Sequence, residues 1–165
     1  MEAVSELVKD KAIARTGRIS ATHPLAVTDE EGKRRILLDE QHKIYITQGD
    51  IRQVQLCKGA ILSGILTLLE RLELTPSDID RVLVAGQFGK HLNEASLVGA
   101  GLIPKELEER IHYIGNSSRM GAQMCLLSQA ERKRAEQIAC AISYVELSVS
   151  PGYDRLFASS MQFGG

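Results

Sequence analysis

The sequence predicts a three-layer α/β domain, in which helices cover the two faces of a sheet. Segments with helical periodicity alternate with short β-rich runs, which is the pattern of this fold class. Two apolar runs, residues 82–85 and 111–114, end directly on a glycine, as buried strands do where they deliver backbone to a ligand. The chain has 165 residues, enough for one domain with a real core, so we expect a single domain over residues 1–165.

The N-terminal part of the sequence predicts a helix followed by a hairpin. Apolar residues recur at helical spacing over residues 3–15, and Gly17 stands in the usual position after the end of such a helix. No N-cap residue precedes this helix, so we expect it to be a helix truncated at its N-terminal end. Two β-rich runs, residues 35–38 and 43–46, flank a short polar segment and predict a hairpin.

A capping box predicts the start of the longest helix. Thr47 is followed three residues later by Asp50, and residues 51–72 then carry apolar side chains at spacings of three and four. We expect this segment to be the central packing helix. A turn at 75–79 leads from it to the buried strand that starts at Val82.

Short helices and strands alternate over the second half of the chain. The expected helices cover residues 93–98, 104–110, 118–127 and 130–143 and the segment after Pro151. The expected strands cover residues 111–114 and 145–149. The charged run Glu131-Arg132-Lys133-Arg134 reads as a solvated helix face rather than an interaction patch.

Composition excludes several classes of partner. The 20 basic and 21 acidic residues give a net charge of -1, which provides no field for nucleic acid or an anionic membrane surface. No run approaches the roughly 18 apolar residues of a membrane span, and the first residues lack the features of a signal peptide. We therefore expect a cytoplasmic protein with no nucleic-acid or membrane partner.

The metal-ligating residue types show no metal-site spacing. Cys57, Cys125 and Cys140 fall inside helical apolar patterns, without the close pairs of zinc or iron-sulfur sites, so we expect buried core thiols. His23, His42 and His112 are likewise scattered without metal spacing, so we expect structural or surface groups. No nucleophile elbow, P-loop or dinucleotide fingerprint is present, and no complete catalytic constellation is visible.

Two glycine turns are the candidate ligand sites. In Gly86-Gln87-Phe88-Gly89 the glycines would let backbone approach a base or a ribose. The alternative, a plain strand exit that needs positive φ angles, stays open because a lone Gly-x-x-Gly is a weak motif. In Gly115-Asn116-Ser117-Ser118, Asn116 or Ser117 would cap the next helix, whose amides could accept an anion; an ordinary N-cap is the simpler interpretation.

Four blocks in the same order carry a resemblance to a known family. They are residues 46–61, residues 84–89, residues 114–116 with Gly121-Ala122, and residues 144–148. Together they resemble the C-terminal part of the reductive activators of corrinoid proteins, ATP-dependent members of the superfamily of acetate and sugar kinases, heat-shock chaperones and actin. The resemblance implies a ribonuclease-H-like three-layer subdomain, with a mixed sheet flanked by helices and with an N-terminal helix and hairpin.

The resemblance also implies a function. Such activators join an N-terminal 2Fe-2S domain through a linker to a two-lobed ATPase, which drives an electron uphill to an inactive Co(II) corrinoid protein. The implied cofactors are ATP with Mg²⁺, and a 2Fe-2S cluster in a missing N-terminal domain with none in this chain. The implied partner is a corrinoid protein, with a homodimer possible. The implied nucleotide-binding and hinge residues are Gly86, Gln87, Phe88, Gly89, Gly115, Asn116, Ser117 and Gly121.

Departures from the family pattern predict that this chain carries only part of the ATPase. The Asp-x-Gly-Thr phosphate loops of the superfamily and a cluster-binding cysteine array are both missing from the sequence. The chain therefore reads as a C-terminal fragment of a longer iron-sulfur protein, with half a nucleotide cleft and no ATP hydrolysis of its own. Residues 117–119, Ser-Ser-Arg, stand where small or apolar residues are common in the family.

Two other interpretations remain open. The first is a non-catalytic module of the same fold that dimerises or docks a partner. The second, a fragment of a sugar or carboxylate kinase, leaves the blocks at residues 53–56 and 146–148 unexplained.

Overall fold

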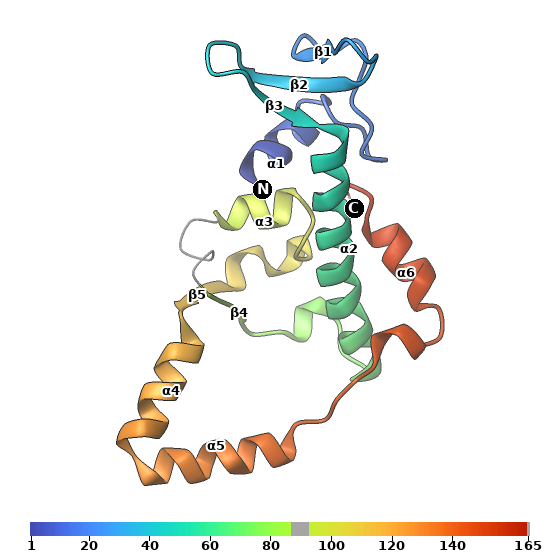
Figure 1. Cartoon of the computed structure of the whole chain (residues 1–165). Helices are drawn as coiled ribbons and strands as arrows, with labels where there is room; N and C mark the ends of the chain where they lie inside the picture. Colours follow the sequence, from blue (N-terminus) through green and yellow to red (C-terminus); the bar gives the residue numbers. More distant parts are fainter. Residues whose placement is uncertain (87–92, 165) are drawn as a thin grey trace.

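The structure is a computed structural model that describes residues 1–86 and 93–164. Its α-helices are α1 (Glu2–Lys9), α2 (Gln48–Arg71), α3 (Glu94–Gly99), α4 (Ser117–Leu127), α5 (Gln129–Ala141) and α6 (Tyr153–Ser160). Its 3-10 helices are η1 (Pro76–Asp78), η3 (Lys105–Arg110) and η4 (Leu147–Val149). Its strands are β1 (Ala26–Thr28), β2 (Arg34–Asp39), β3 (Ile44–Thr47), β4 (Val82–Ala85) and β5 (Ile111–Gly115). The mixture of strands and flanking helices confirms the predicted α/β class (Figure 1).

The described strands lie in two sheets rather than in one mixed sheet. β1, β2 and β3 form an antiparallel sheet in that order, and its β2–β3 pair is the predicted hairpin. β4 and β5 form a parallel pair in which Val82 lies opposite Ile111. The N-terminal helix and hairpin are confirmed, while β1 was not anticipated because its three residues are too short for an alternating pattern.

α2 is the long central helix against which other elements pack, as the sequence predicts (Figure 1). The capping box is present: the Asp50 amide donates to Thr47 Oγ1 at 3.2 Å, and the Thr47 amide donates to Asp50 Oδ2 at 2.9 Å. α6 packs closely along α2 at Gly59, where a Cβ would lie 2.7 Å from Met161 Cγ. The missing side chain at Gly59 therefore sets how closely the two helices approach.

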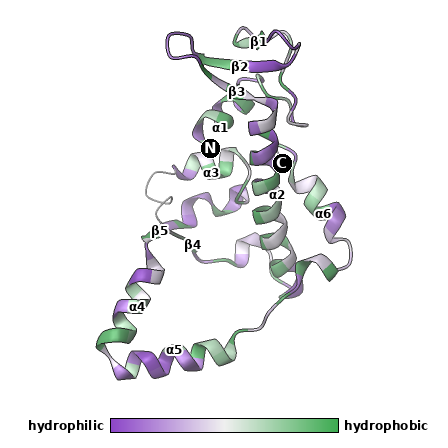
Figure 2. Cartoon of the chain, viewed as in Figure 1, coloured by the Kyte–Doolittle hydropathy of each residue, from purple (hydrophilic) through white to green (hydrophobic). Residues whose placement is uncertain are grey.

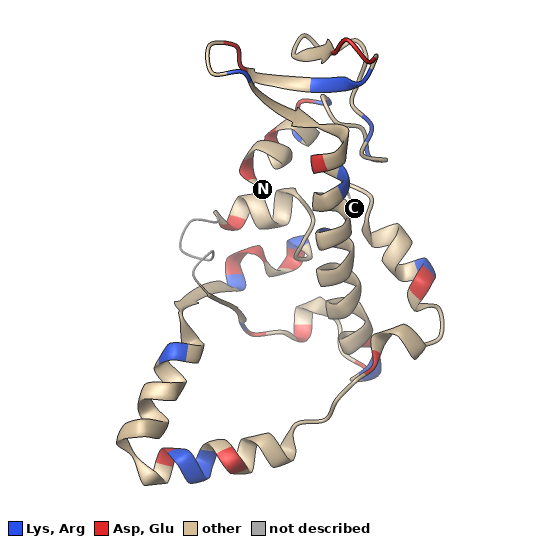
Figure 3. Ribbon diagram, in the orientation of Figure 1, with Lys and Arg blue, Asp and Glu red and all other residues tan. Residues whose placement is uncertain are grey.

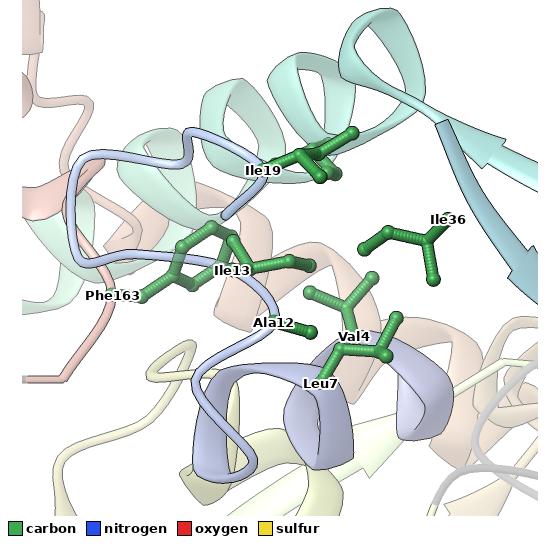
Figure 4. Close-up of a cluster of buried hydrophobic side chains, with 8 residues drawn as sticks. Val4, Leu7, Ala12, Ile13, Ile19, Ile36 and Phe163 are labelled. Atoms are coloured by element: carbon green, nitrogen blue, oxygen red, sulfur yellow. The ribbon is translucent and has the colours of Figure 1, made fainter. Parts of the chain in front are cut away.

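Two hydrophobic clusters hold the described parts together. The first joins α1, the loop after it, β2, α2 and the C-terminal segment, and its side chains point toward one another in Figure 4. Its buried members are Val4, Leu7, Ala12, Ile13, Ile19, Ile36, Ile51 and Phe163. The second lies beneath β4 and β5, and its buried members are Leu97, Ala100, Leu102, Ile103, Leu107 and Ile111.

The predicted helix over residues 3–15 is wrong beyond Lys9. Lys11 has φ 60°, a left-handed conformation that ends the helix. The chain then turns at Gly17, with φ 82°, and Ile13 forms an antiparallel bridge with Ile19. The bridge lets both isoleucines enter the first cluster, which a continuing helix would not achieve.

The predicted strand over residues 145–149 is also wrong. Residues 147–149 form η4, and Glu146 Oε1 accepts hydrogen bonds from the Ser148 amide at 3.2 Å and from Ser148 Oγ at 2.6 Å. This local capping by a side chain competes with strand pairing. Val149 is 77% exposed, so the alternating pattern buries no apolar face here.

The expectation of buried cysteines is wrong for all three. Cys57 and Cys140 are exposed, Cys125 is partly buried, and all are free thiols. They belong to the apolar patterns of α2, α5 and α4, but the faces that carry them are not covered by the described residues. Periodicity identifies a helix face and not what packs against it.

α4 and α5 form an arm that projects from the two clusters (Figure 1). Neither helix has a buried residue. Leu126 and Leu127, at the corner between them, are 76% and 85% exposed, and this apolar corner is visible in Figure 2. The charged residues of α5 gather in its first half (Figure 3), and none of them is buried, in agreement with the solvated helix face predicted for residues 131–134. No helix in the described part of the chain combines the length and apolarity that crossing a bilayer requires.

Candidate functional site

The two predicted glycine turns meet at one edge of the parallel pair. β4 and β5 run in the same direction, so their carboxyl ends lie side by side. The Gly86 amide donates a hydrogen bond to the Gly115 carbonyl at 2.7 Å. The pairing register shifts between Val84 and Ala85, just before this contact. In open α/β sheets this edge is where ligands bind, and the structure brings Gly86 and Gly115, one residue from each candidate turn, together there.

Both glycines adopt backbone conformations that other residues avoid. Gly86 has φ +104° and Gly115 has φ +65°. A Cβ built on either glycine would have no described atom within 4 Å. Among the described residues, glycine is therefore required here for its conformation rather than by crowding.

Asn116 and Ser117 begin the helix that leaves this edge. Asn116 Oδ1 accepts a hydrogen bond from the Arg119 amide at 2.9 Å and so caps α4, of which Ser117 is the first residue. The simpler of the two sequence interpretations, an ordinary N-cap, is therefore correct for the Asn116 side chain. Gly121 lies one turn further along α4, and a Cβ there would also meet no described atom within 4 Å.

The other predicted residues of the first turn, Gln87, Phe88 and Gly89, lie outside the described residues. The structure thus places Gly86, Gly115, Asn116 and Ser117 together at the strand ends, with Gly121 further away on α4.

Tyr113 is a candidate that the sequence analysis missed. It lies opposite Val84 in the parallel pair, two residues before Gly115. Its hydroxyl oxygen is buried and has no hydrogen-bond partner among the described residues. Burial, and to a lesser degree the Glu94 carboxylate, raise the pKa of Tyr113, which keeps the hydroxyl protonated as a donor. A tyrosine within an apolar strand was the available signal, because a buried hydroxyl usually seeks a partner.

The described residues hold no group of three or more histidine, cysteine, aspartate or glutamate side chains that could bind a metal ion. At the strand ends, no described atom lies within 4 Å of a Cβ built on Gly86 or Gly115.

The fold defines an α/β domain in which the carboxyl ends of a parallel strand pair meet at one edge. The family described as the C-terminal domain of RACo, the ASKHA domain, matches residues 1–165. The chain belongs to this family, and the resemblance drawn from the four sequence blocks is confirmed.

Two relatives agree with this assignment. Corrinoid activation enzyme RamQ of Eubacterium limosum is 29% identical over 178 residues, a match that covers 99% of this chain and 30% of RamQ. A solved structure, a reductive activator for corrinoid, iron-sulfur protein, is 32% identical and has a TM-score of 0.86, with 98% of this chain and 27% of that protein covered. The chain therefore spans less than a third of the length of each.

Proposed function

We propose that this chain is the C-terminal nucleotide-binding part of an ATP-dependent reductive activator of a corrinoid protein, and one domain of a longer iron-sulfur protein. The observation that carries the proposal is the pair of glycines, Gly86 and Gly115, joined at the carboxyl edge of β4 and β5, where no described atom lies within 4 Å of a Cβ built on either glycine. Family membership over residues 1–165 and the names of the two relatives support the same function.

In this proposal the strand ends hold the adenosine half of ATP. Gly86 and Gly115 supply backbone that a base or ribose can approach, and residues 87–89 belong to the same turn in sequence. Asn116 fixes the start of α4, and Ser117 and Gly121 lie on the segment that would connect this part to the other lobe. In this proposal the described residues would hold only the nucleoside, and the donors and carboxylates that hold phosphates and Mg²⁺ would come from elsewhere in the protein.

In this proposal the 2Fe-2S cluster lies in another part of the longer protein, and that longer protein acts on the corrinoid protein. A 2Fe-2S cluster needs four cysteine ligands in close spacing, and Cys57, Cys125 and Cys140 do not provide them. The cluster would supply the electron and ATP the free energy for reducing Co(II) in the corrinoid protein. We place this reaction in the cytoplasm.

Nucleotide binding tests the proposal through the Gly86→Val variant. Valine disfavours φ +104° and would fill the open space, so MgATP should raise the Tm of the unsubstituted protein and not that of the variant. At about 100 times Kd the nucleotide adds about 2.7 kcal/mol of stability, which a thermal scan resolves.

Gly32→Val is the matched control. Gly32 has φ +77° and no atom within 4 Å of a built Cβ, but it lies in the turn between β1 and β2. This variant should keep the MgATP response and, in the intact protein, the ATP-dependent reduction of the corrinoid partner. Equal responses of the two variants would contradict a nucleotide site at Gly86.

The second candidate function is a dimerisation or docking module, and the exposed arm of α4 and α5 favours it. Leu126 and Leu127 form an apolar corner that the described residues leave uncovered. Absence of any MgATP response in the intact protein, together with loss of self-association in a Leu127→Ser variant, would favour this function instead.

A further inference from the structure

A cavity of about 590 Å³ lies between α2, α3 and η3. Its wall is largely apolar and includes Leu62, Leu66 and Ile103. Neither Gly86 nor Gly115 lines it, so it is separate from the candidate nucleotide site. Its volume is in the range of small-molecule pockets.

Lys58, whose side chain is buried, is among the residues that line this cavity. Lys58 is only 2% exposed, in the middle of α2, and its Nζ donates one hydrogen bond, to the Ser160 carbonyl at 2.6 Å. An ammonium group has three hydrogens to donate. No ion pair of Lys58 with a carboxylate occurs among residues 1–86 and 93–164. A charge buried without a partner is costly, and desolvation accordingly lowers the pKa of Lys58.

The loop after α3 is shaped around this side chain. Gly101 has φ +76°, and a Cβ there would lie 2.6 Å from Lys58 Cε and 3.1 Å from Nζ. Any other residue at this position would push the ammonium away from its present place. The backbone at Gly101 and the carbonyl end of α6 therefore hold Lys58 at the cavity.

No other charged residue around the cavity forms an ion pair with Lys58 among the described residues. Lys9 also lines the cavity, but its ammonium pairs at 2.7 Å with Glu6, which does not line it. Lys105, Glu106 and Glu108 line the cavity from η3. Neither glutamate makes a hydrogen bond with Lys58 among the described contacts.

We propose that this cavity binds a small monocarboxylate with an apolar tail, its carboxylate on Lys58 Nζ and its tail against Leu62, Leu66 and Ile103. One buried ammonium balances one negative charge, and the apolar wall matches a hydrocarbon chain. The simpler alternative is that Lys58 only stabilises the carbonyl end of α6.

Octanoate is the probe, titrated into the intact protein by calorimetry, with octan-1-ol as the uncharged analogue of equal chain length. We expect octanoate to bind and octan-1-ol to bind at least about tenfold more weakly, the loss that follows from one charge-assisted hydrogen bond. This comparison needs no variant and so does not depend on how a substitution folds.

The variant Lys58→Met keeps the length of the side chain and removes the charge, and Lys133→Met removes a lysine from the exposed face of α5. Octanoate binding should weaken about tenfold or more in Lys58→Met and stay unchanged in Lys133→Met. Absence of octanoate binding, equal binding of octan-1-ol, or unchanged binding in a folded Lys58→Met variant would overturn the proposal and leave the α6 cap as the role of Lys58. Gly86→Val should leave octanoate binding intact, so this site and the nucleotide site fail independently.

Discussion

The turn at Gly17 offers the sharpest test of how α2 is held in place. Gly17 has φ +82°, and a Cβ there would lie 2.5 Å from the amide carbon and nitrogen of Gln55. Gln55 Nε2 donates to the Thr16 carbonyl at 3.2 Å and to the Met161 carbonyl at 3.1 Å. Gln55 is only 4% exposed. One amide group therefore joins α2, the N-terminal turn and the end of α6, which gives a structural reason for a glutamine in the block at residues 53–56.

We expect Gly17→Ala to destabilise the chain through two additive effects. The left-handed conformation costs a residue with a Cβ about 1–2 kcal/mol. Displacing Gln55 loses two hydrogen bonds, each worth about 0.5–1.5 kcal/mol. The expected loss in the free energy of unfolding is therefore about 2–5 kcal/mol.

Urea unfolding of matched variants separates the two effects. Gly32→Ala meets the same conformational cost, since Gly32 has φ +77°, but nothing lies within 4 Å of its Cβ. In a Gln55→Ala background the cost of Gly17→Ala should fall to that of Gly32→Ala. If Gly17→Ala costs no more than Gly32→Ala while Gln55 is present, the proposed role of the Gln55 amide is refuted.

Three further predictions concern a cap, a buried charge and the C-terminal segment. Thr47→Ala should cost about 1 kcal/mol in urea unfolding. Hydrogen bonds from Thr47 hold the pKa of Asp50 below 3.8. The stability that the ionised Asp50 gains from Thr47 is therefore present above pH 3.8 and is lost as the pH falls through the lowered pKa. A destabilisation by Thr47→Ala that stays constant into strong acid would contradict this prediction. Burial lowers the pKa of Lys58, so the unfolded chain binds more protons between that lowered value and 10.5. The stability of the unsubstituted chain relative to Lys58→Met should therefore rise with pH across this window, and a flat difference would show that the amine is solvated. Phe163→Ala should cost about 3–5 kcal/mol, because Phe163 is fully buried in the first cluster; a cost under about 1 kcal/mol would mean that the C-terminal segment does not close that cluster.

Features with a local physical cause could be predicted from the sequence. The capping box at Thr47 and the glycines after β4 and β5 depend on residues a few positions apart, and the structure has them as expected. The convergence of Gly86 and Gly115 was not predicted; it follows from the parallel pairing of β4 and β5, which places their carboxyl ends together.

Features that depend on distant packing could not be predicted in the same way. The helix that ends at Lys9 carries an apolar pattern further, but the turn at Gly17 buries Ile13 more effectively. Cys57 lies in an apolar helical pattern and is nevertheless exposed. A lysine within a helix indicates a solvated face, so the burial of Lys58 follows only from the approach of Gly101 and α6.

The parallel pair of β4 and β5 is the part of the fold that most needs a neighbour. Parallel sheets are usually covered on both faces and have more than two strands, yet Leu83 on β4 is 58% exposed. If the chain works within a longer protein, as proposed, that protein would cover this face. Leu83→Asp should then change the unfolding free energy of this chain by no more than about 0.5 kcal/mol, and should lower the soluble yield and the nucleotide response of the intact protein, where the carboxylate would be buried. A loss in the chain alone as large as that of Phe163→Ala would show that its own residues already cover Leu83.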